Sequence, residues 1–162
     1  MTHQTSTLPR RKRIALIAHD DRKQDLLEWA RFNIGRLGRH EILATGTTGT
    51  LLKQALGLPV QTFLSGPLGG DQQIGAKIAQ SEVDVLIFFW DPLESHPHDP
   101  DVRALLRLAV LQNIPVAMNR SSADFIFSSA LMDDDYERQH YDFAGRLERR
   151  RAVDALRASG EK

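Results

Sequence analysis

A glycine-rich turn that ends in a carboxylate is the stretch whose residue types point most directly to chemistry. Residues 65–71 are Ser-Gly-Pro-Leu-Gly-Gly-Asp, which predicts a loop, and an apolar pattern with helical spacing begins at Ile74. Asp71 is therefore placed near a helix start, where its carboxylate is a candidate general base. The alternative is that Asp71 only caps this helix, because Asp is among the favoured N-cap residues.

A second loop, rich in threonine and glycine, is a candidate anion site. Residues 45–49 are Thr-Gly-Thr-Thr-Gly and lead into an apolar helical pattern over 51–56. Backbone amides at a helix N-terminus attract anions and hydroxyl groups add donors, so this loop is predicted to hold a phosphate group, unless it is an ordinary capped turn. The pattern matches neither GxxxxGK[ST] nor GxGxxG, which argues against nucleoside triphosphates and dinucleotides. Further contacts could come from Ser65, Gly66 and Lys23.

Histidines and further carboxylates occupy two other loops, 19–21 and 90–101. The HxH spacing of His96 and His98, with carboxylates nearby, would suit zinc or manganese. The motif is short, however, and its prolines are explained by the shape of the loop, so we expect no metal. The favoured interpretation is that His98 hydrogen-bonds a substrate oxygen and that Asp101 orients it.

A regular alternation of apolar strands and amphipathic helices positions these loops. The sequence predicts strands at 14–18, 41–44, 60–64, 85–89 and 114–118, and helices at 22–34, 51–56, 74–81, 102–109 and 123–129. This alternation predicts an α/β fold: a doubly wound, five-stranded parallel sheet with helices on both faces, in the Rossmann-like or flavodoxin-like three-layer class. The loops that follow the strands of such a sheet lie at one edge, so the candidate residues are expected to converge there.

Three segments are expected along the chain. They are a basic N-terminal tail at 1–12, the α/β domain at 13–130 and a charged, helical C-terminal tail at 131–162. The basic run of residues 10–13 is interpreted as a solvated lead-in to the first strand. It is not taken for part of a secretory signal, because the apolar run after it is short, and no membrane span is expected.

Composition narrows the possible partners and chemistry. Lys and Arg total 21 and Asp and Glu total 21, so no overall field attracts nucleic acid or an anionic membrane. The chain has no cysteine, which excludes disulfides, thiolate metal sites and a cysteine nucleophile and fits a cytoplasmic location. GxSxG is also absent, which argues against a serine hydrolase. A base, an acid and a phosphate grip without an evident cofactor suit proton abstraction next to a carbonyl, and triose phosphates are natural substrates for that chemistry.

In their order along the chain, these motifs resemble the methylglyoxal synthase family. The matching stretches are Ala18-His19-Asp20 with Lys23, residues 44–49, 64–67, 69–73, 85–92 and 97–101, Asn119 and residues 123–125. The resemblance implies an enzyme that converts dihydroxyacetone phosphate into methylglyoxal and inorganic phosphate without a metal or an organic cofactor. It also implies a homohexamer that phosphate inhibits.

The resemblance further implies roles for individual residues. Asp71 would be the base that takes a proton from the hydroxymethyl carbon, and His19 and His98 would bind the substrate oxygens, with His98 carrying a proton between them. The residues expected to hold the phosphate are Lys23, Thr45, Gly46, Thr47, Thr48, Ser65 and Gly66. The carboxylates expected around them are Asp20, Asp91 and Asp101. In the tail, Arg150 would reach a phosphate across a subunit boundary, with Arg146, Arg149 and Arg151 competing for that role.

Two other functions remain open at this point. The regulatory domain of carbamoyl phosphate synthetase and a domain of inosine monophosphate cyclohydrolase share the fold and the phosphate cradle, so a phosphate- or nucleotide-sensing module is the main alternative. A triose phosphate isomerase on this fold is the other. The lyase is favoured because Asp71, His98 and Asp101 are more than a sensor needs and because the sequence contains no further domain to regulate.

Overall fold

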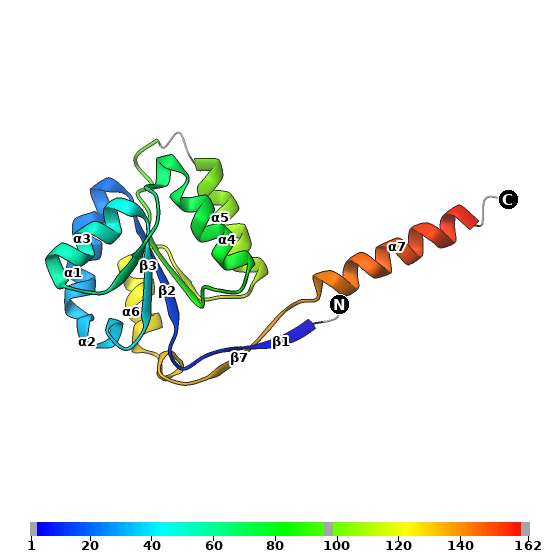
Figure 1. Cartoon of the computed structure of the whole chain (residues 1–162), viewed down its shortest axis with the longest axis horizontal. Coiled ribbons are helices and arrows are strands. Elements are labelled where there is room, and N and C mark those ends of the chain that lie inside the picture. The colour runs from blue at the N-terminus through cyan, green and yellow to red at the C-terminus, as the bar shows by residue number, and fades with distance from the viewer. Residues whose placement is uncertain (1–2, 96–98, 160–162) are drawn as a thin grey trace.

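The core of the protein is a parallel sheet between two layers of helices, as the computed structural model in Figure 1 shows. The structure describes residues 3–95 and 99–159. The strands of the sheet are β2 (Arg13–Ala18), β3 (Glu41–Ala44), β4 (Val60–Thr62), β5 (Val85–Phe89) and β6 (Val116–Ala117). Every neighbouring pair is parallel and the order is β4-β3-β2-β5-β6, which confirms the predicted five-stranded parallel sheet.

Helices cover both faces of the sheet because its strands are apolar on both faces. The helices are α1 (Lys23–Phe32), α2 (Ile34–Leu37), α3 (Gly46–Leu56), α4 (Gly70–Ala79), α5 (Asp99–Leu111) and α6 (Arg120–Ser128). Short 3₁₀ turns are η1 (Asp20–Arg22), η2 (Gly66–Leu68) and η3 (Ala130–Met132). In β2, Ile14 and Leu16 pack with residues of α1, α3 and α6, whereas Ala15 and Ile17 pack with residues of α4 and α5. The alternation follows the period of two along a strand, so each face of β2 contributes to its own core.

The strand order reverses direction beside β2, and this fixes where a ligand can bind. From β2 the chain proceeds to β3 and β4 on one side and then crosses to β5 and β6 on the other. The parallel strands all end at one edge of the sheet, which we call the carboxyl edge. The opposite edge, at which they begin, is called the amino edge. The loops after β2 and β5 diverge at the carboxyl edge, which is the usual ligand site of a doubly wound sheet.

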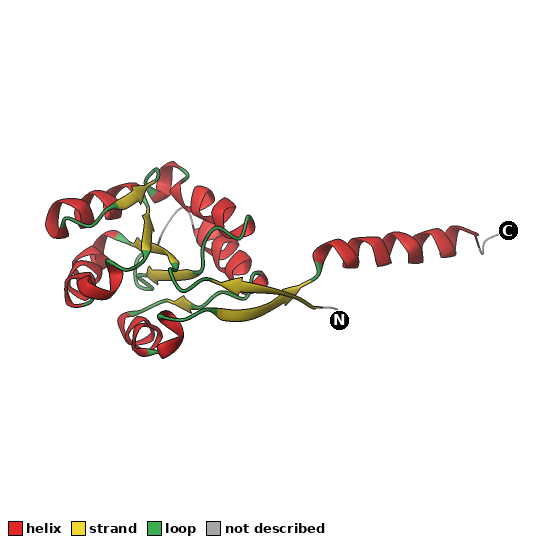
Figure 2. Cartoon of the chain, turned by 60° about the horizontal axis from the view of Figure 1, so that its bottom comes forward, coloured by secondary structure: helices red, strands yellow, loops and turns green. Residues whose placement is uncertain are grey.

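The two ends of the described chain form an arm that the sequence did not predict. Strand β1 (His3–Leu8) pairs antiparallel with β7 (Tyr136–Tyr141), and α7 (Phe143–Ser159) continues from it away from the sheet (Figures 1 and 2). Within the tail that the sequence predicts to be helical, residues 143–159 form a helix, whereas residues 136–141 form a strand instead. The strand escapes prediction because its partner lies more than a hundred residues away in the sequence and its own residues show no clear apolar alternation.

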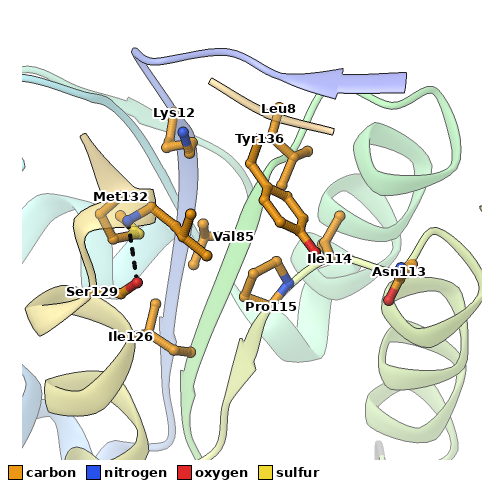
Figure 3. A pocket seen from close by; sticks show the side chains of 11 residues that line it. Leu8, Lys12, Val85, Asn113, Ile114, Pro115, Ile126, Ser129, Met132 and Tyr136 are labelled. Atoms are coloured by element: carbon orange, nitrogen blue, oxygen red, sulfur yellow. Dashed lines mark hydrogen bonds between the residues drawn. The ribbon is translucent and has the colours of Figure 1, made fainter. Parts of the chain in front are cut away.

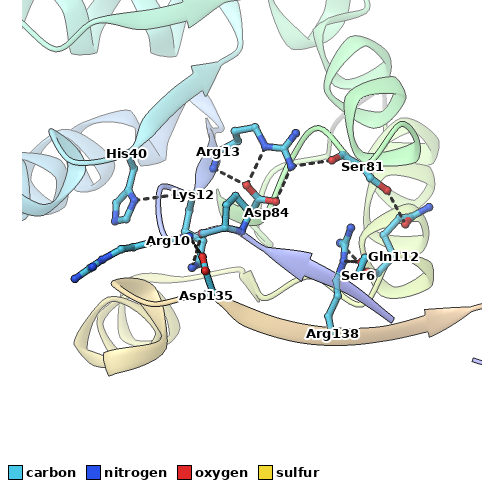
Figure 4. Close-up of polar contacts among 11 residues, drawn as sticks. Ser6, Arg10, Lys12, Arg13, His40, Ser81, Asp84, Gln112, Asp135 and Arg138 are labelled. Carbon is cyan, nitrogen blue, oxygen red and sulfur yellow. Dashed lines mark hydrogen bonds and ion pairs between the residues drawn. The ribbon is translucent and has the colours of Figure 1, made fainter. Parts of the chain in front are cut away.

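Side chains of the basic run at 10–13 differ in burial more than the sequence suggested. Arg10 and Arg11 are exposed, as expected of a solvated lead-in, but Lys12 is buried. The Arg13 guanidinium donates to the buried carboxylate of Asp84 at 2.8 and 2.9 Å, and these hydrogen bonds raise the pKa of Arg13 (Figure 4). The run therefore anchors the start of β2 as well as leading into it.

The other predicted elements are confirmed with shifts at their ends. The helix predicted at 22–34 is divided into η1, α1 and the start of α2. Strands β4 and β6 are shorter than the strands predicted at 60–64 and 114–118. Helix α5 begins at Asp99, earlier than the apolar pattern indicated. Within the described residues, none of the helices is long and apolar enough to span a membrane.

Candidate active site

A cavity of about 250 Å³ opens at the carboxyl edge, where loops from four strands meet. Its lining residues are Ile17, Ala18, His19, Asp20, Lys23, Thr45, Thr47, Ser65, Gly66, Pro67, Asp71 and Glu94. Most of the candidate residues named from the sequence are in this set, which confirms that the strand-to-helix loops bring them together. We call it the carboxyl-edge cavity.

His19 lies at the centre of the carboxyl edge, between the loops that follow β2 and β5. Its backbone N–H donates to the carbonyl of Phe89, and its Nδ1 accepts the backbone N–H of Asp91 at 3.1 Å. The ring stacks edge-on against Phe88 with centroids 5.0 Å apart, and the residue is 6% exposed. Because Nδ1 accepts a hydrogen bond, the ring is held in the neutral tautomer with its proton on Nε2. His19 is therefore a neutral donor.

The threonine loop forms the N-terminus of α3, as the sequence predicted. Helix α3 begins at Gly46, so the amides of Thr47 and Thr48 lie in the first turn, where an α-helix offers them no carbonyl four residues earlier. The Gly46 N–H is used differently, because it donates to the carbonyl of Leu64 at 2.9 Å. A Cβ on Gly46 would lie 3.0 Å from the carbonyl oxygen of Phe63, so glycine lets the loops after β3 and β4 meet. These two loops form one continuous wall.

Thr45 and Thr47 line the carboxyl-edge cavity, but Thr48 does not. The Thr48 hydroxyl is buried and has no hydrogen-bond partner among the described residues. Its predicted contribution to an anion site is therefore limited to its backbone amide.

The turn over 65–71 brings a carboxylate back toward the start of the same turn. Gly69 adopts a φ of +101°, and a Cβ on Gly70 would lie 2.0 Å from the carbonyl oxygen of Leu64, so both positions require glycine. A Cβ on Gly66 would lie 3.3 Å from Oδ2 of Asp71, which places the carboxylate directly beside Gly66. Asp71 is only 3% exposed. The turn thus holds a buried carboxylate against its own opening residues.

Asp71 is not the N-cap of the following helix. Helix α4 starts at Gly70 with Gly69 as its N-cap, and Asp71 is the second helical residue, in the first turn. The capping alternative considered from the sequence is therefore wrong in its literal form. The helix dipole still favours the carboxylate at this position.

Carboxylates outnumber cations around the carboxyl-edge cavity. Lys23 forms an ion pair with Asp20 rather than facing a ligand alone. Asp91 is buried and is not part of the lining; its Oδ1 accepts the Leu93 N–H at 3.0 Å and lies 4.0 Å from the Arg22 guanidinium. An anionic substrate would therefore depend on backbone amides and hydroxyls more than on positive side chains in this chain.

A small acidic group lies beside the cavity. The carboxylate oxygens of Asp21, Asp91 and Glu94 lie within 4.8 Å of one another. A cation could be ligated at that spacing, but acidic side chains at a surface commonly lie this close without one. Glu94, in the loop after β5, was not singled out from the sequence.

Among the described residues, Asp101 and Arg150 are not part of the lining of the carboxyl-edge cavity. Asp101 lies in the first turn of α5 and is not part of the lining. His98, like His96, lies outside the described residues. Arg150 is exposed on α7, which extends away from the sheet (Figure 2). Within one chain, α7 therefore does not bring Arg150 to the cavity.

Comparisons with known proteins show the family to which the chain belongs. The model of the MGS-like domain family matches residues 25–118. A methylglyoxal synthase of Saccharophagus degradans is 57% identical over 143 residues, with 88% of this chain and 93% of the relative covered. One of Cellvibrio japonicus is 52% identical over 150 residues, covering 93% and 97%. The crystal structure of methylglyoxal synthase from Elizabethkingia anophelis superposes with a TM-score of 0.84 at 50% identity, covering 89% of this chain and 95% of that one. The chain belongs to the methylglyoxal synthase family.

Proposed function

We infer that the protein is a lyase that converts dihydroxyacetone phosphate into methylglyoxal and inorganic phosphate. Relatives that share more than half of their aligned residues with it, over most of the chain, are named methylglyoxal synthases. For this chain, the inference is carried by the turn over 65–71, in which a buried carboxylate lies beside a loop suited to phosphate. One short turn then sets the distance between a base and a leaving group.

In the first step, Asp71 removes a proton from the hydroxymethyl carbon of the substrate. The electron pair of that C–H bond forms a carbon–carbon double bond, and the carbonyl oxygen takes up the negative charge. His19 supports this step, because its Nε2–H can donate to the oxygen on which charge develops. In our proposal His98 carries a proton between the two enediolate oxygens.

In the second step, the enediolate expels phosphate. The hydroxyl on the former hydroxymethyl carbon becomes an aldehyde, the carbon–oxygen bond to phosphate breaks, and the resulting enol takes up a proton on carbon to give the methyl group of methylglyoxal. Elimination requires the breaking bond to stand out of the enediolate plane. The wall formed by Thr45, Thr47, Ser65 and Gly66 is joined by the hydrogen bond from the Gly46 N–H to the Leu64 carbonyl and could hold the phosphate in that rotamer. An isomerase would instead hold the bond in the plane.

The test is phosphate release from dihydroxyacetone phosphate by the parent protein and by Asp71→Asn. Loss of a general base should slow release by about a hundredfold or more. Glu94→Gln is the matched control, since it removes a carboxylate from the same cavity at a position without an assigned role, and it should retain activity near the parent's.

Three outcomes would count against the proposal. If the parent releases no phosphate, the lyase is wrong and a sensor is favoured. Formation of glyceraldehyde 3-phosphate without phosphate release would indicate an isomerase. If Asp71→Asn stays folded and keeps near-parental turnover, the base has been assigned wrongly.

We also propose that the active unit is a homo-oligomer, a homohexamer as in the family, and that Arg150 acts on a neighbouring subunit's phosphate. Helix α7 supports this, because its apolar residues Leu147, Val153 and Leu156 are exposed in the single chain. The excess of carboxylates around the cavity supports an added cation. Inorganic phosphate, as the product, would compete for the same cradle. The lack of cysteine supports a cytoplasmic location.

Mixing two inactive variants tests the contribution of Arg150. Asp71→Asn supplies Arg150 and Arg150→Ala supplies Asp71, so co-refolded mixtures should recover activity at the sites that combine both intact residues. Arg157→Ala, on the same exposed helix, should remain active by itself. If the mixture is no more active than the sum of its two components, Arg150 does not act across subunits.

A further inference from the structure

A cavity of about 270 Å³ at the amino edge of the sheet is lined mostly by positively charged side chains. Its lining residues are Arg10, Arg11, Arg39, His40 and Asp133. They come from three separate segments: the lead-in to β2, the residue pair before β3 and the stretch before β7. We call it the arginine cavity. It lies at the opposite edge of the sheet from the carboxyl-edge cavity, so it is not part of the proposed active site.

His40 is the buried polar residue of the arginine cavity. The residue is 5% exposed, and its Nδ1 accepts the backbone N–H of Lys12 at 3.1 Å (Figure 4). Burial lowers the pKa of His40, which favours the neutral ring. Because Nδ1 is an acceptor, the proton of the neutral ring is on Nε2. The Nε2 atom is shielded from solvent and has no hydrogen-bond partner among the described residues.

A buried N–H group without an acceptor costs free energy, so such a group points to a missing acceptor. The acceptor is expected to be an anion, because three of the five residues that line the cavity are arginines. Asp133 offsets part of this charge, since it lies 3.4 Å from Arg36 and 3.8 Å from Arg39, and Glu41 lies 3.6 Å from Arg11. The side chains of Arg11 and Arg39 are nevertheless 68% and 67% exposed, so they can swing aside to admit a ligand and then close on it.

A second cavity at the amino edge differs from the arginine cavity in the side chains that line it. It measures about 280 Å³ and is lined mainly by apolar side chains such as Leu8, Val85 and Ile114 (Figure 3). Lys12 is the charged residue in its wall, and its Nζ already donates to the carbonyls of Pro9 and Asp134 at 2.7 and 2.5 Å. Its ammonium is thus satisfied by the backbone, whereas Nε2 of His40 has no hydrogen-bond partner among the described residues and the ion pairs of Arg11 and Arg39 involve exposed side chains.

We propose that the arginine cavity binds a small phosphate-class oxyanion, either inorganic phosphate or the phosphate group of a metabolite. His40 Nε2–H and the guanidinium groups of Arg10, Arg11 and Arg39 donate to its oxygens, an arrangement that suits a tetrahedral, multiply charged acceptor. The concave shape and the zero net charge of the chain favour a small anion over a nucleic acid.

The test is an NMR titration of the full-length protein with inorganic phosphate. Protein labelled with ¹³C at histidine Cε1 gives a signal for His40, assigned by its absence in His40→Gln. Phosphate should shift this signal saturably, and sodium chloride at equal ionic strength should not. The double variant Arg10→Gln/Arg39→Gln should weaken the binding by about tenfold or more, because charge-assisted hydrogen bonds are lost. Lys53→Gln removes one exposed positive charge from α3 and should bind as the parent does.

Site counting keeps the proposal testable if His40→Gln does not fold. Equilibrium dialysis with radiolabelled phosphate should find one site fewer per chain in the double arginine variant than in the parent. A phosphorylated metabolite, dihydroxyacetone phosphate, is titrated in parallel to separate the two sources of the phosphate group. The proposal is overturned if phosphate does not shift the His40 signal, if the double variant binds as well as the parent, or if only an RNA oligonucleotide gives saturation.

Discussion

Two histidines at opposite edges of the sheet make the same kind of hydrogen bond, but the residues around them differ in charge. His19 at the carboxyl edge and His40 at the amino edge are both buried, and each accepts a backbone N–H through Nδ1 at 3.1 Å. Each ring is therefore held neutral with a proton on Nε2. Carboxylates such as Asp71 line the cavity beside His19, whereas arginines line the cavity beside His40. The surroundings, and not the imidazole, decide what each histidine can do.

The difference follows from how the two edges are built. At the carboxyl edge, helix N-termini and glycine turns supply neutral backbone donors, which in our proposal hold a phosphate while a nearby carboxylate acts as a base. At the amino edge, the chain enters the strands, and long side chains from Arg10 and Arg39 supply the donors instead. We expect the first edge to carry out chemistry and the second to bind an anion without changing it.

The largest effect that tests the difference between the two edges is expected from replacing His19, the histidine at the carboxyl edge. His19→Gln should lower the turnover of dihydroxyacetone phosphate by about a hundredfold or more, because a donor aimed at developing charge is displaced. His140→Gln, on the arm and away from both cavities, is the matched control and should stay near the parental rate. Phosphate release at saturating substrate, with circular dichroism to verify folding, measures both. Near-parental turnover in folded His19→Gln would remove His19 from the mechanism.

The sequence predicted the carboxyl edge far better than the amino edge. Continuous apolar runs such as 85–89 identify buried parallel strands, and the topology then brings the loops that follow them to one place. The convergence of Thr45, Ser65 and Asp71 was therefore predictable from the order of elements alone. What could not be predicted is that Asp71 is buried beside Gly66, because this depends on the exact path of the turn.

The amino edge depends on pairings between segments that are far apart in the sequence. Arg10 and Asp133 meet only because β1 pairs with β7 across almost the whole chain. No local periodicity reports such a pairing, so the basic run at 10–13 by itself indicates only a solvated lead-in to β2. The one available signal was the number of arginines in the chain before β2 and β3, and by itself it did not distinguish a site from a solvated surface.

A smaller effect, on stability rather than activity, tests the amino-edge histidine. Burial is the main cause that lowers the pKa of His40, and Lys12, Arg39 and Arg36 lower it further, while Asp133 acts in the opposite direction. In the unfolded chain the histidine titrates near its ordinary value of about 6.5. Below that pH the unfolded state binds more protons than the folded state, so the contribution of His40 to stability is present above about pH 6.5 and is lost as the pH falls through the folded-state pKa.

Urea unfolding at a series of pH values, in buffers free of phosphate, measures this contribution. The free energy of unfolding of the parent should fall more steeply below about pH 6.5 than that of His40→Gln, which has no ring to protonate. His140→Gln, which removes a histidine of β7 that lines neither cavity, is the matched control and should follow the parent. Equal slopes for the parent and His40→Gln would mean that protonation of His40 costs the fold nothing. The neutral, Nε2-protonated ring on which the comparison with His19 rests would then be wrong.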